Sequence, residues 1–186
     1  MKKLVLVITI SVFSFSTNAQ SFGAKLGLNI SNISGDATDN NEAKVGIALG
    51  AVAEFKLSEI FAFQPEIVYS SQGVATKDSK VKLKMNYLNV PLIAKYYPTE
   101  NLSLQFGPQI GFLISAKVDN GERTVDVDDN LKTIDLGLSL GLGYKLDSGL
   151  FFDARYNFGL SDINDYQTNS KNHNSVINFS VGYFFN

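Results

Sequence analysis

Five charged residues stand at alternate positions of segments that are otherwise rich in apolar side chains: Glu66, Lys95, Asp135, Asp153 and Arg155. Opposite charges that share an enclosed face form ion pairs, and such a network is either a packed polar plug or a gate or path for protons and ions. We expect a polar plug, because charges of both signs inside a narrow lumen can form ion pairs with one another. Arg155 and Glu66 are predicted to belong to one network.

A second group of residues could support acyl transfer. His173 is the only histidine, and Ser161, Asp162 and Ser175 are its neighbours in sequence. A serine, a histidine and an acid catalyse acyl transfer only when they are hydrogen-bonded in that order. Because residues 164–172 are polar throughout, we interpret this segment as a solvated loop and expect no enzyme.

The acidic loop from Asp119 to Asp129 invites comparison with calcium sites. Its carboxylates lack the regular spacing of an EF-hand loop, so solvation of a surface loop is the simpler interpretation. The chain has no cysteine, no histidine cluster for zinc and no glycine-rich phosphate loop before a helix. We therefore expect no metal and no cofactor.

The segment Lys132 to Leu146, which contains Asp135, shows most clearly what structure carries these charges. Two kinds of residue alternate along it. Leucines, Ile134 and Tyr144 occupy one face, whereas Asp135, small residues and Lys145 occupy the other. Only a β-strand sends successive side chains to opposite sides, and the glycines would weaken a helix.

Seven further segments show the same alternation. The eight predicted strands are Phe22–Asn32, Lys44–Lys56, Phe61–Gln72, Val81–Tyr97, Leu102–Lys117, Lys132–Leu146, Leu150–Leu160 and Ser175–Asn186.

Three local features refine these strands. Pro65 cannot donate to a sheet ladder, so it predicts a bulge or a broken pairing. The polar face of the fourth strand changes parity near Tyr87, which predicts a β-bulge there. Asp147-Ser148-Gly149 is a hairpin turn, and strands paired about Ser148 would set Arg155 opposite Gly141 and Asp153 opposite Gly143, leaving room for the arginine.

The connections between the strands alternate long and short. An even number of strands with short turns at one end and long loops at the other is typical of outer-membrane barrels. The strands, of about 11 to 17 residues, are also long enough to cross the hydrocarbon, for which roughly 9 to 11 tilted residues suffice. Aromatic residues gather at both rims, as two membrane interfaces require: Phe22, Phe55, Phe61, Tyr96, Tyr144, Phe152 and Tyr183 near the short turns, and Tyr69, Tyr87, Phe112 and Phe158 near the long loops.

The N-terminus has the pattern of a secretory signal peptide. Lys2 and Lys3 precede an apolar stretch, and small or polar residues end at Ala19. We predict a signal peptide over residues 1–19 and one barrel domain over residues 20–186. Cleavage would lower the basic residues from 16 to 14 against 18 acidic ones, so the formal net charge moves from −2 to −4. An acidic chain without a basic stripe is a poor candidate for nucleic-acid binding.

Five short motifs resemble the PorT-like outer-membrane β-barrel family of Bacteroidetes-type bacteria. They are Gly23-Ala24-Lys25-Leu26-Gly27-Leu28-Asn29, Gln64-Pro65-Glu66, Asn86-Tyr87-Leu88-Asn89-Val90-Pro91-Leu92, Gly107-Pro108-Gln109, and Ala154-Arg155-Tyr156-Asn157 with Gly159-Leu160. The resemblance covers the whole mature chain and implies an outer-membrane barrel. It implies no particular activity.

The fold expected is therefore all-β: an eight-stranded, antiparallel, up-and-down transmembrane β-barrel in the outer membrane of a Gram-negative bacterium. A barrel of this size encloses no wide pore, so we expect a monomer with a structural or interaction role. Its partners would be outer-membrane lipid and envelope proteins that meet the extracellular loops.

One alternative is a soluble lipocalin-like barrel with the aliphatic face inside, around an apolar ligand. A more distant one is a small outer-membrane acyl-transfer enzyme.

Overall fold

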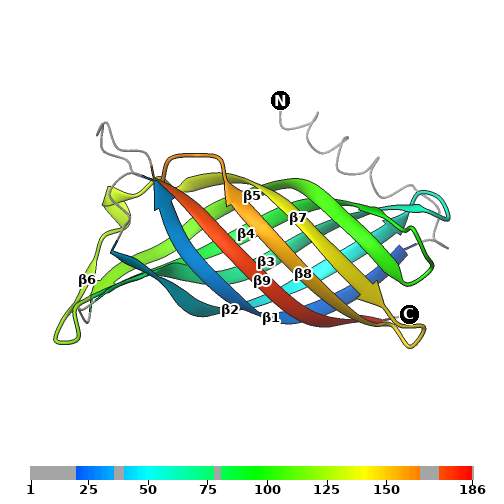
Figure 1. Ribbon diagram of the computed structural model, residues 1–186, viewed down its shortest axis with the longest axis horizontal. Helices are drawn as coiled ribbons and strands as arrows, with labels where there is room; N and C mark the ends of the chain where they lie inside the picture. The colour runs from blue at the N-terminus through cyan, green and yellow to red at the C-terminus, as the bar shows by residue number, and fades with distance from the viewer. Residues whose placement is uncertain (1–19, 36–39, 78–80, 164–171, 186) are drawn as a thin grey trace, which may run out of the picture.

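Eight long strands wrap around a common axis in the computed structural model (Figure 1). The structure describes residues 20–35, 40–77, 81–163 and 172–185, so the predicted signal peptide and the stretch 164–171 lie outside the described residues. The barrel strands are β1 Gln20–Gly35, β2 Asn41–Lys56, β3 Phe61–Thr76, β4 Lys82–Tyr96, β5 Leu102–Asp119, β7 Ile134–Lys145, β8 Leu150–Gly159 and β9 Asn172–Phe185.

Each barrel strand is antiparallel to its neighbours, and the ring closes where β1 pairs with β9. Closure gives the wall strands partners on both sides, so the wall has no free sheet edge, as a membrane requires. A short strand, β6 Thr124–Asp126, pairs with the end of β5, and a 3-10 turn, η1 Asp128–Asn130, follows it. The predicted eight-stranded antiparallel barrel is confirmed.

The two faces of the wall have opposite character. On β1, Leu26 and Leu28 are 55% and 56% exposed on the outside, whereas Lys25 and Asn29 are 5% and 1% exposed on the inside. This is the arrangement of a membrane barrel, in which apolar groups face lipid and small or polar groups fill the lumen. The lipocalin-like alternative, which needs the aliphatic face inside, is therefore wrong.

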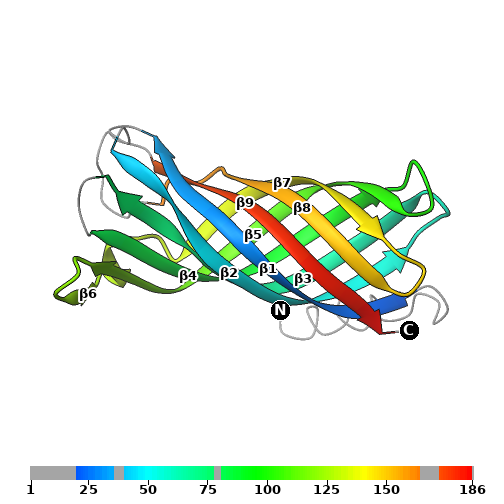
Figure 2. The ribbon, with the colours of Figure 1, turned by 60° about the horizontal axis from the view of Figure 1, so that its bottom comes forward.

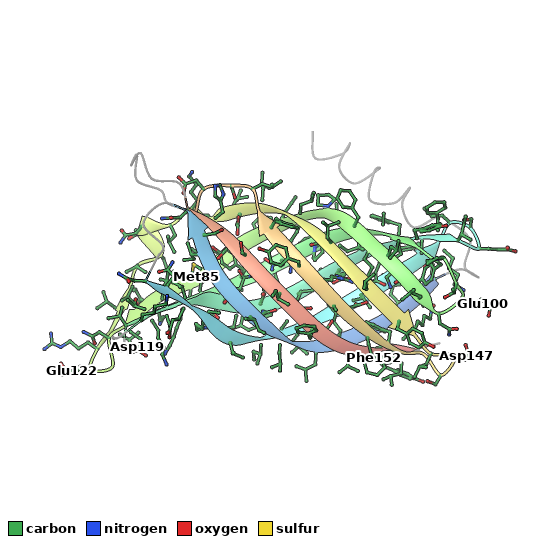
Figure 3. All side chains as sticks on the ribbon, viewed as in Figure 1. Met85, Glu100, Asp119, Glu122, Asp147 and Phe152 are labelled. Carbon is green, nitrogen blue, oxygen red and sulfur yellow. The ribbon has the colours of Figure 1, made fainter. Side chains whose placement is uncertain are left out.

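Short and long connections lie at opposite ends of the barrel. Figures 1 and 2 show both ends of the described chain, near Gln20 and Phe185, at the end with the short turns. Glu100 and Asp147 mark that end in Figure 3, and Asp119 and Glu122 mark the end with the longer loops.

The predicted rims of aromatic residues are present with one correction. Phe22, Phe61 and Tyr183 are exposed on the outside near the short turns, and Phe112 and Phe158 are exposed toward the other end. Tyr87, however, is 1% exposed and packs in the lumen against Met85 and Ile33. The expectation that Tyr87 lies at the outer rim depended on a β-bulge next to it in the same strand, because such a bulge would turn its side chain outward.

The bulge lies in β5 rather than in the predicted fourth strand. Along β4, Met85, Tyr87 and Asn89 all point inward without a break. The β4–β5 pairing shifts from Asn86 with Ser115 to Tyr87 with Leu113, so Ile114 is the extra residue. Lys82, Lys84 and Asn86 suggested a change of face because they are polar, but they face outward beyond the apolar band, and Lys82 is not a lumen residue.

Pro65 interrupts pairing without moving the register. The ladder between β2 and β3 lapses from Val52 with Glu66 to Phe55 with Phe63, and the register is the same on both sides. The predicted broken pairing is confirmed, since proline has no amide hydrogen to donate.

Gly143→Val should prevent folding, because a Cβ at Gly143 would lie 2.6 Å from Ser103 Oγ and 2.7 Å from Asp153 Oδ1 inside the lumen. We expect the variant to lose the shift in gel migration between unboiled and boiled samples that folded barrels give. Ala154→Val, on the exposed outer face of β8, is the matched control and should keep the shift. A folded Gly143→Val barrel would show that the lumen is less tightly filled than described.

Candidate functional site

The centre of the lumen holds a network of buried ion pairs. Glu66 of β3 forms ion pairs with two cations, with Oε1 2.7 Å from Arg155 Nη1 and Oε2 2.5 Å from Lys25 Nζ. These side chains are at most 4% exposed and come from β3, β8 and β1, so the contacts cross the lumen. Gln64 Nε2 also donates to Glu66 Oε1 at 2.7 Å.

The same network continues from Arg155 to β5. Arg155 Nη2 lies 3.1 Å from Asp153 Oδ2, and Arg155 Nε donates to Gln105 Oε1 at 2.5 Å. Gln105 Nε2 in turn donates to Asp153 Oδ1 at 2.6 Å. Lys25, Glu66, Gln105, Asp153 and Arg155 therefore form one unit, called the central network below.

Glycines on β7 make room for the central network. Arg155 pairs with Gly141 and Asp153 pairs with Gly143, as predicted from the hairpin at Ser148. A Cβ at Gly141 would lie 2.6 Å from Arg155 Cγ. The arginine can cross the lumen only because the wall beside it has no side chain.

The charges of the central network balance, with two cations and two carboxylates. Charges that are withdrawn from water are tolerated when each is paired and hydrogen-bonded. Removing one partner would leave an uncompensated buried charge, so the network constrains which strands stand opposite one another.

Lys95, predicted for the same network, lies in a second cluster nearer the short turns. Its Nζ is 2.9 Å from Glu54 Oε2, and Lys145 Nζ is 3.0 Å from Glu54 Oε1. The Tyr97 hydroxyl donates to Glu54 Oε2 at 2.6 Å. The Lys95 ammonium lies 5.8 Å from the centre of the Phe184 ring, within range of a cation–π contact.

Asp135 lies apart from both clusters, toward the long loops. Its carboxylate accepts from Ser161 Oγ at 2.7 Å and from Asn174 Nδ2 at 3.1 Å. Alternation placed Asp135 on the inner face, but its height along the barrel, set by the strand tilt, separates it from Arg155.

An apolar cluster fills the lumen beyond the central network, toward the long loops. It consists of buried side chains from β1, β3, β4, β5 and the segment after β8, packed against partly buried residues that include two from the loop after β6. They are Ile33, Val74, Met85, Tyr87, Ala116 and Ile163, with Leu83, Leu113, Val127 and Leu131. We call this cluster the apolar cap.

Sequence reasoning did not pair Lys25 with Glu66 or Glu54 with Lys95 and Lys145. Alternation along their strands places Lys25, Glu54, Glu66, Lys95 and Lys145 on the inner face, so the signal for burial is present in the sequence. To predict these ion pairs, one must know how strands are shifted along one another around the barrel. For example, Gly50 of β2 pairs with Lys25 of β1 and with Val68 of β3, and alternation within a strand does not give this register.

The residues considered for acyl transfer do not line up for it. Ser161 Oγ donates to Asp135 rather than to the histidine, and His173 Nδ1 lies 3.0 Å from the backbone oxygen of Ser161. A triad needs the histidine to accept the serine proton.

Among the described residues, no group of three or more histidine, cysteine, aspartate or glutamate side chains could hold a metal ion. No helix in the same part of the chain is long and apolar enough to span a membrane.

Arg155→Ala should destabilise the barrel by about 3 to 5 kcal/mol, because it leaves the carboxylates of Glu66 and Asp153 less compensated inside the lumen. The measurement is urea unfolding in detergent micelles, followed by gel migration without boiling. Lys56→Ala, at the exposed end of β2, is the control and should lie within about 0.5 kcal/mol of the parent. Equal midpoints for Arg155→Ala and the parent would contradict a structural role for the network.

Comparisons with known proteins agree with this architecture. The family described as outer membrane protein beta-barrel domain matches residues 16–165. No match was found among curated proteins.

Three solved structures share the fold. Neisserial surface protein A (NspA) is 16% identical with a TM-score of 0.63, and the match covers 90% of this chain and 100% of that one. Ail, the attachment invasion locus protein of Yersinia pestis, is 15% identical with a TM-score of 0.57, covering 90% and 99%. A major outer membrane protein of Thermus thermophilus is 14% identical with a TM-score of 0.53, covering 90% and 100%.

Because the family match spans most of the barrel and the strand architecture agrees with it, the chain belongs to the outer membrane protein beta-barrel domain family and is a β-barrel protein of the Gram-negative outer membrane.

Proposed function

We propose that this protein is a closed barrel that serves the cell envelope through its wall and its extracellular loops, and that it is neither a wide pore nor an enzyme. The observation that carries the proposal is the filled lumen. At its centre, the free space bounded by Lys25, Glu66 and Arg155 is about 20 Å³. That is room for about one water molecule, since a water needs roughly 10 to 15 Å³ measured in this way.

Both ends of the lumen support the same proposal. From the short turns, a polar vestibule of about 1060 Å³ enters the barrel, and Glu54, Tyr97 and Lys145 are among the residues that line it. These three belong to the second charged cluster, which is packed beside buried Phe151 and Phe184. From the long loops, the apolar cap stands in the way of polar solutes.

The non-enzymatic part of the proposal rests on the geometry of Ser161, Asp135 and His173, in which the serine hydroxyl is committed to the carboxylate. A network of buried ion pairs could also be a gate or a proton path. A plug is favoured because Glu66, Asp153 and Arg155 already satisfy one another.

Partners of the barrel would then meet its outside and its loops. The exposed apolar wall suits outer-membrane lipid, and the hairpin formed by β5 and β6 projects beyond the wall at the long-loop end, where envelope proteins could bind (Figure 2). We propose a monomer with no nucleic-acid partner.

Membership of the PorT-like branch is part of the same proposal. The motifs Gln64-Pro65-Glu66 and Ala154-Arg155-Tyr156-Asn157 supply both members of the Arg155–Glu66 ion pair, which supports that resemblance. A signal peptide over residues 1–19 completes the proposal.

Purified protein inserted into planar lipid bilayers should give no uniform conductance steps, because the central network and the apolar cap leave no continuous water path. Detergent without protein is the control for artefacts. Reproducible steps from the parent protein would overturn the proposal.

A further inference from the structure

The second charged cluster, near the short turns, is not neutral. Lys95 Nζ lies 2.9 Å from Glu54 Oε2 and Lys145 Nζ lies 3.0 Å from Glu54 Oε1, so two ammonium groups share one carboxylate. In the part of the chain that the structure describes, neither lysine has another carboxylate within ion-pair distance. The cluster therefore carries one positive charge in excess, whereas the central network is balanced.

The groups around this cluster hold the excess charge in place without cancelling it. The centre of the Phe184 ring lies 4.6 Å from Lys145 Nζ and 5.8 Å from Lys95 Nζ. A ring attracts an ammonium group through its π face but carries no net charge. Asp153 acts on nearby Tyr97, but its own charge is already matched within the central network. A charge that is withdrawn from water in this way is costly until a counter-charge pairs with it.

The polar vestibule at the short-turn end gives access to the cluster. It has a volume of about 1060 Å³, and both Glu54 and Lys145 line it. The side chains of Lys95 and Glu54 are 3% and 1% exposed, whereas that of Lys145 is 20% exposed. The short turns of such a barrel face the periplasm. Lys145 is therefore the cation that an anionic group meets first when it enters from the periplasm.

The mouth of the vestibule has the opposite sign. Glu59, Glu100 and Asp147 lie in the short turns, are exposed and line the vestibule. Figure 3 marks Glu100 and Asp147 at this end of the barrel. Lys56 also lines it, and removal of the predicted signal peptide would add the amino group of Gln20. Three acids against these two cations leave the mouth acidic, above a floor that is basic.

This arrangement of charges defines the chemistry of a ligand. One excess positive charge suits a carboxylate, which carries a single negative charge, better than a phosphate monoester, which carries nearly two. Lys145 and Asp147 are two residues apart, or about 7 Å of extended chain. That is the separation between the carboxyl end of a peptide and a basic side chain one or two residues before it. The hydroxyls of Ser21 and Thr99, which also line the vestibule, can donate to peptide carbonyls.

We propose that the vestibule binds the carboxyl end of a peptide that enters from the periplasm. The free carboxylate pairs with Lys145, and a basic side chain just before it lies near Asp147 and Glu100. The plug stays closed, because the ligand occupies the vestibule and does not pass the central network. This site goes beyond the proposed function, in which partners meet only the outer wall and the extracellular loops.

The probe is the peptide acetyl-Gly-Lys-Gly with a free carboxyl end, added to isotope-labelled barrel in an uncharged maltoside detergent. Amide chemical shifts in NMR spectra report both the affinity and the place of binding. We expect shifts that saturate at Thr99 and Lys145, and none at Glu122, at the long-loop end. The same peptide with an amidated end should bind about tenfold more weakly, because it loses one charge-assisted hydrogen bond.

Lys145→Gln leaves the neutral pair of Lys95 with Glu54, so this variant should fold and keep its shift in gel migration. We expect it to bind the free-carboxyl peptide about tenfold more weakly than the parent does. Lys132→Gln, at an exposed position just before the other end of β7, is the matched control and should bind like the parent.

Asp147→Asn tests the mouth separately, and it does so even if Lys145→Gln does not fold. It should weaken acetyl-Gly-Lys-Gly by about threefold, since an exposed ion pair contributes little. It should leave the binding of acetyl-Gly-Gln-Gly, which has the carboxylate but no basic side chain, unchanged.

Equal binding of the free-carboxyl and amidated peptides would overturn the proposal, as would an absence of shifts at Thr99 and Lys145. Unchanged affinity in folded Lys145→Gln would overturn it too. Acetate separates the two sources of a carboxylate. Weaker binding of acetate than of the peptide supports a peptide site, whereas equal binding would assign the floor to any small carboxylate and contradict the peptide.

Discussion

The structure depends on one constraint, that a ring of eight strands leaves an interior only as wide as side chains can fill. Every inward position must therefore match what stands across the lumen in size and charge. Arg155 fits because Gly141 beside it carries no side chain, and its charge is tolerated because Glu66 and Asp153 meet it. Packing and electrostatics therefore both determine which residues can stand beside Arg155 at its height along the barrel axis.

Along the axis, the lumen changes from polar to apolar. The Glu54 cluster lies near the short turns, the central network follows, and amide contacts such as Asn29 with Ser70 lead to the apolar cap. This sequence of layers is what a plug requires, since the charges of the lumen are neutralised in ion pairs and the apolar cap offers no polar path at the long-loop end. The outer wall has the complementary design, with apolar side chains across the bilayer and lysines and carboxylates above it.

Alternation predicted the strands and the inward face, because a strand has a strict period of two, and the order of long and short connections predicted the closed barrel. The hairpin at Ser148 also predicted the partners of Arg155 and Asp153, since a tight turn fixes register locally. Tyr87 was wrongly expected at the rim, because the polar residues Lys82, Lys84 and Asn86 suggest a change of face in β4, although they face outward beyond the apolar band. The sequence could not separate Asp135 and Lys95 from Arg155, because their heights depend on strand stagger around the whole ring.

The account rests on the claim that Arg155 and Glu66 are coupled across the lumen. A double-mutant cycle with Arg155→Met and Glu66→Gln, measured by urea unfolding in micelles, tests it most directly. We predict a coupling energy of at least about 1.5 kcal/mol, because residues in one buried network do not act independently. Additive effects within about 0.5 kcal/mol would contradict the account.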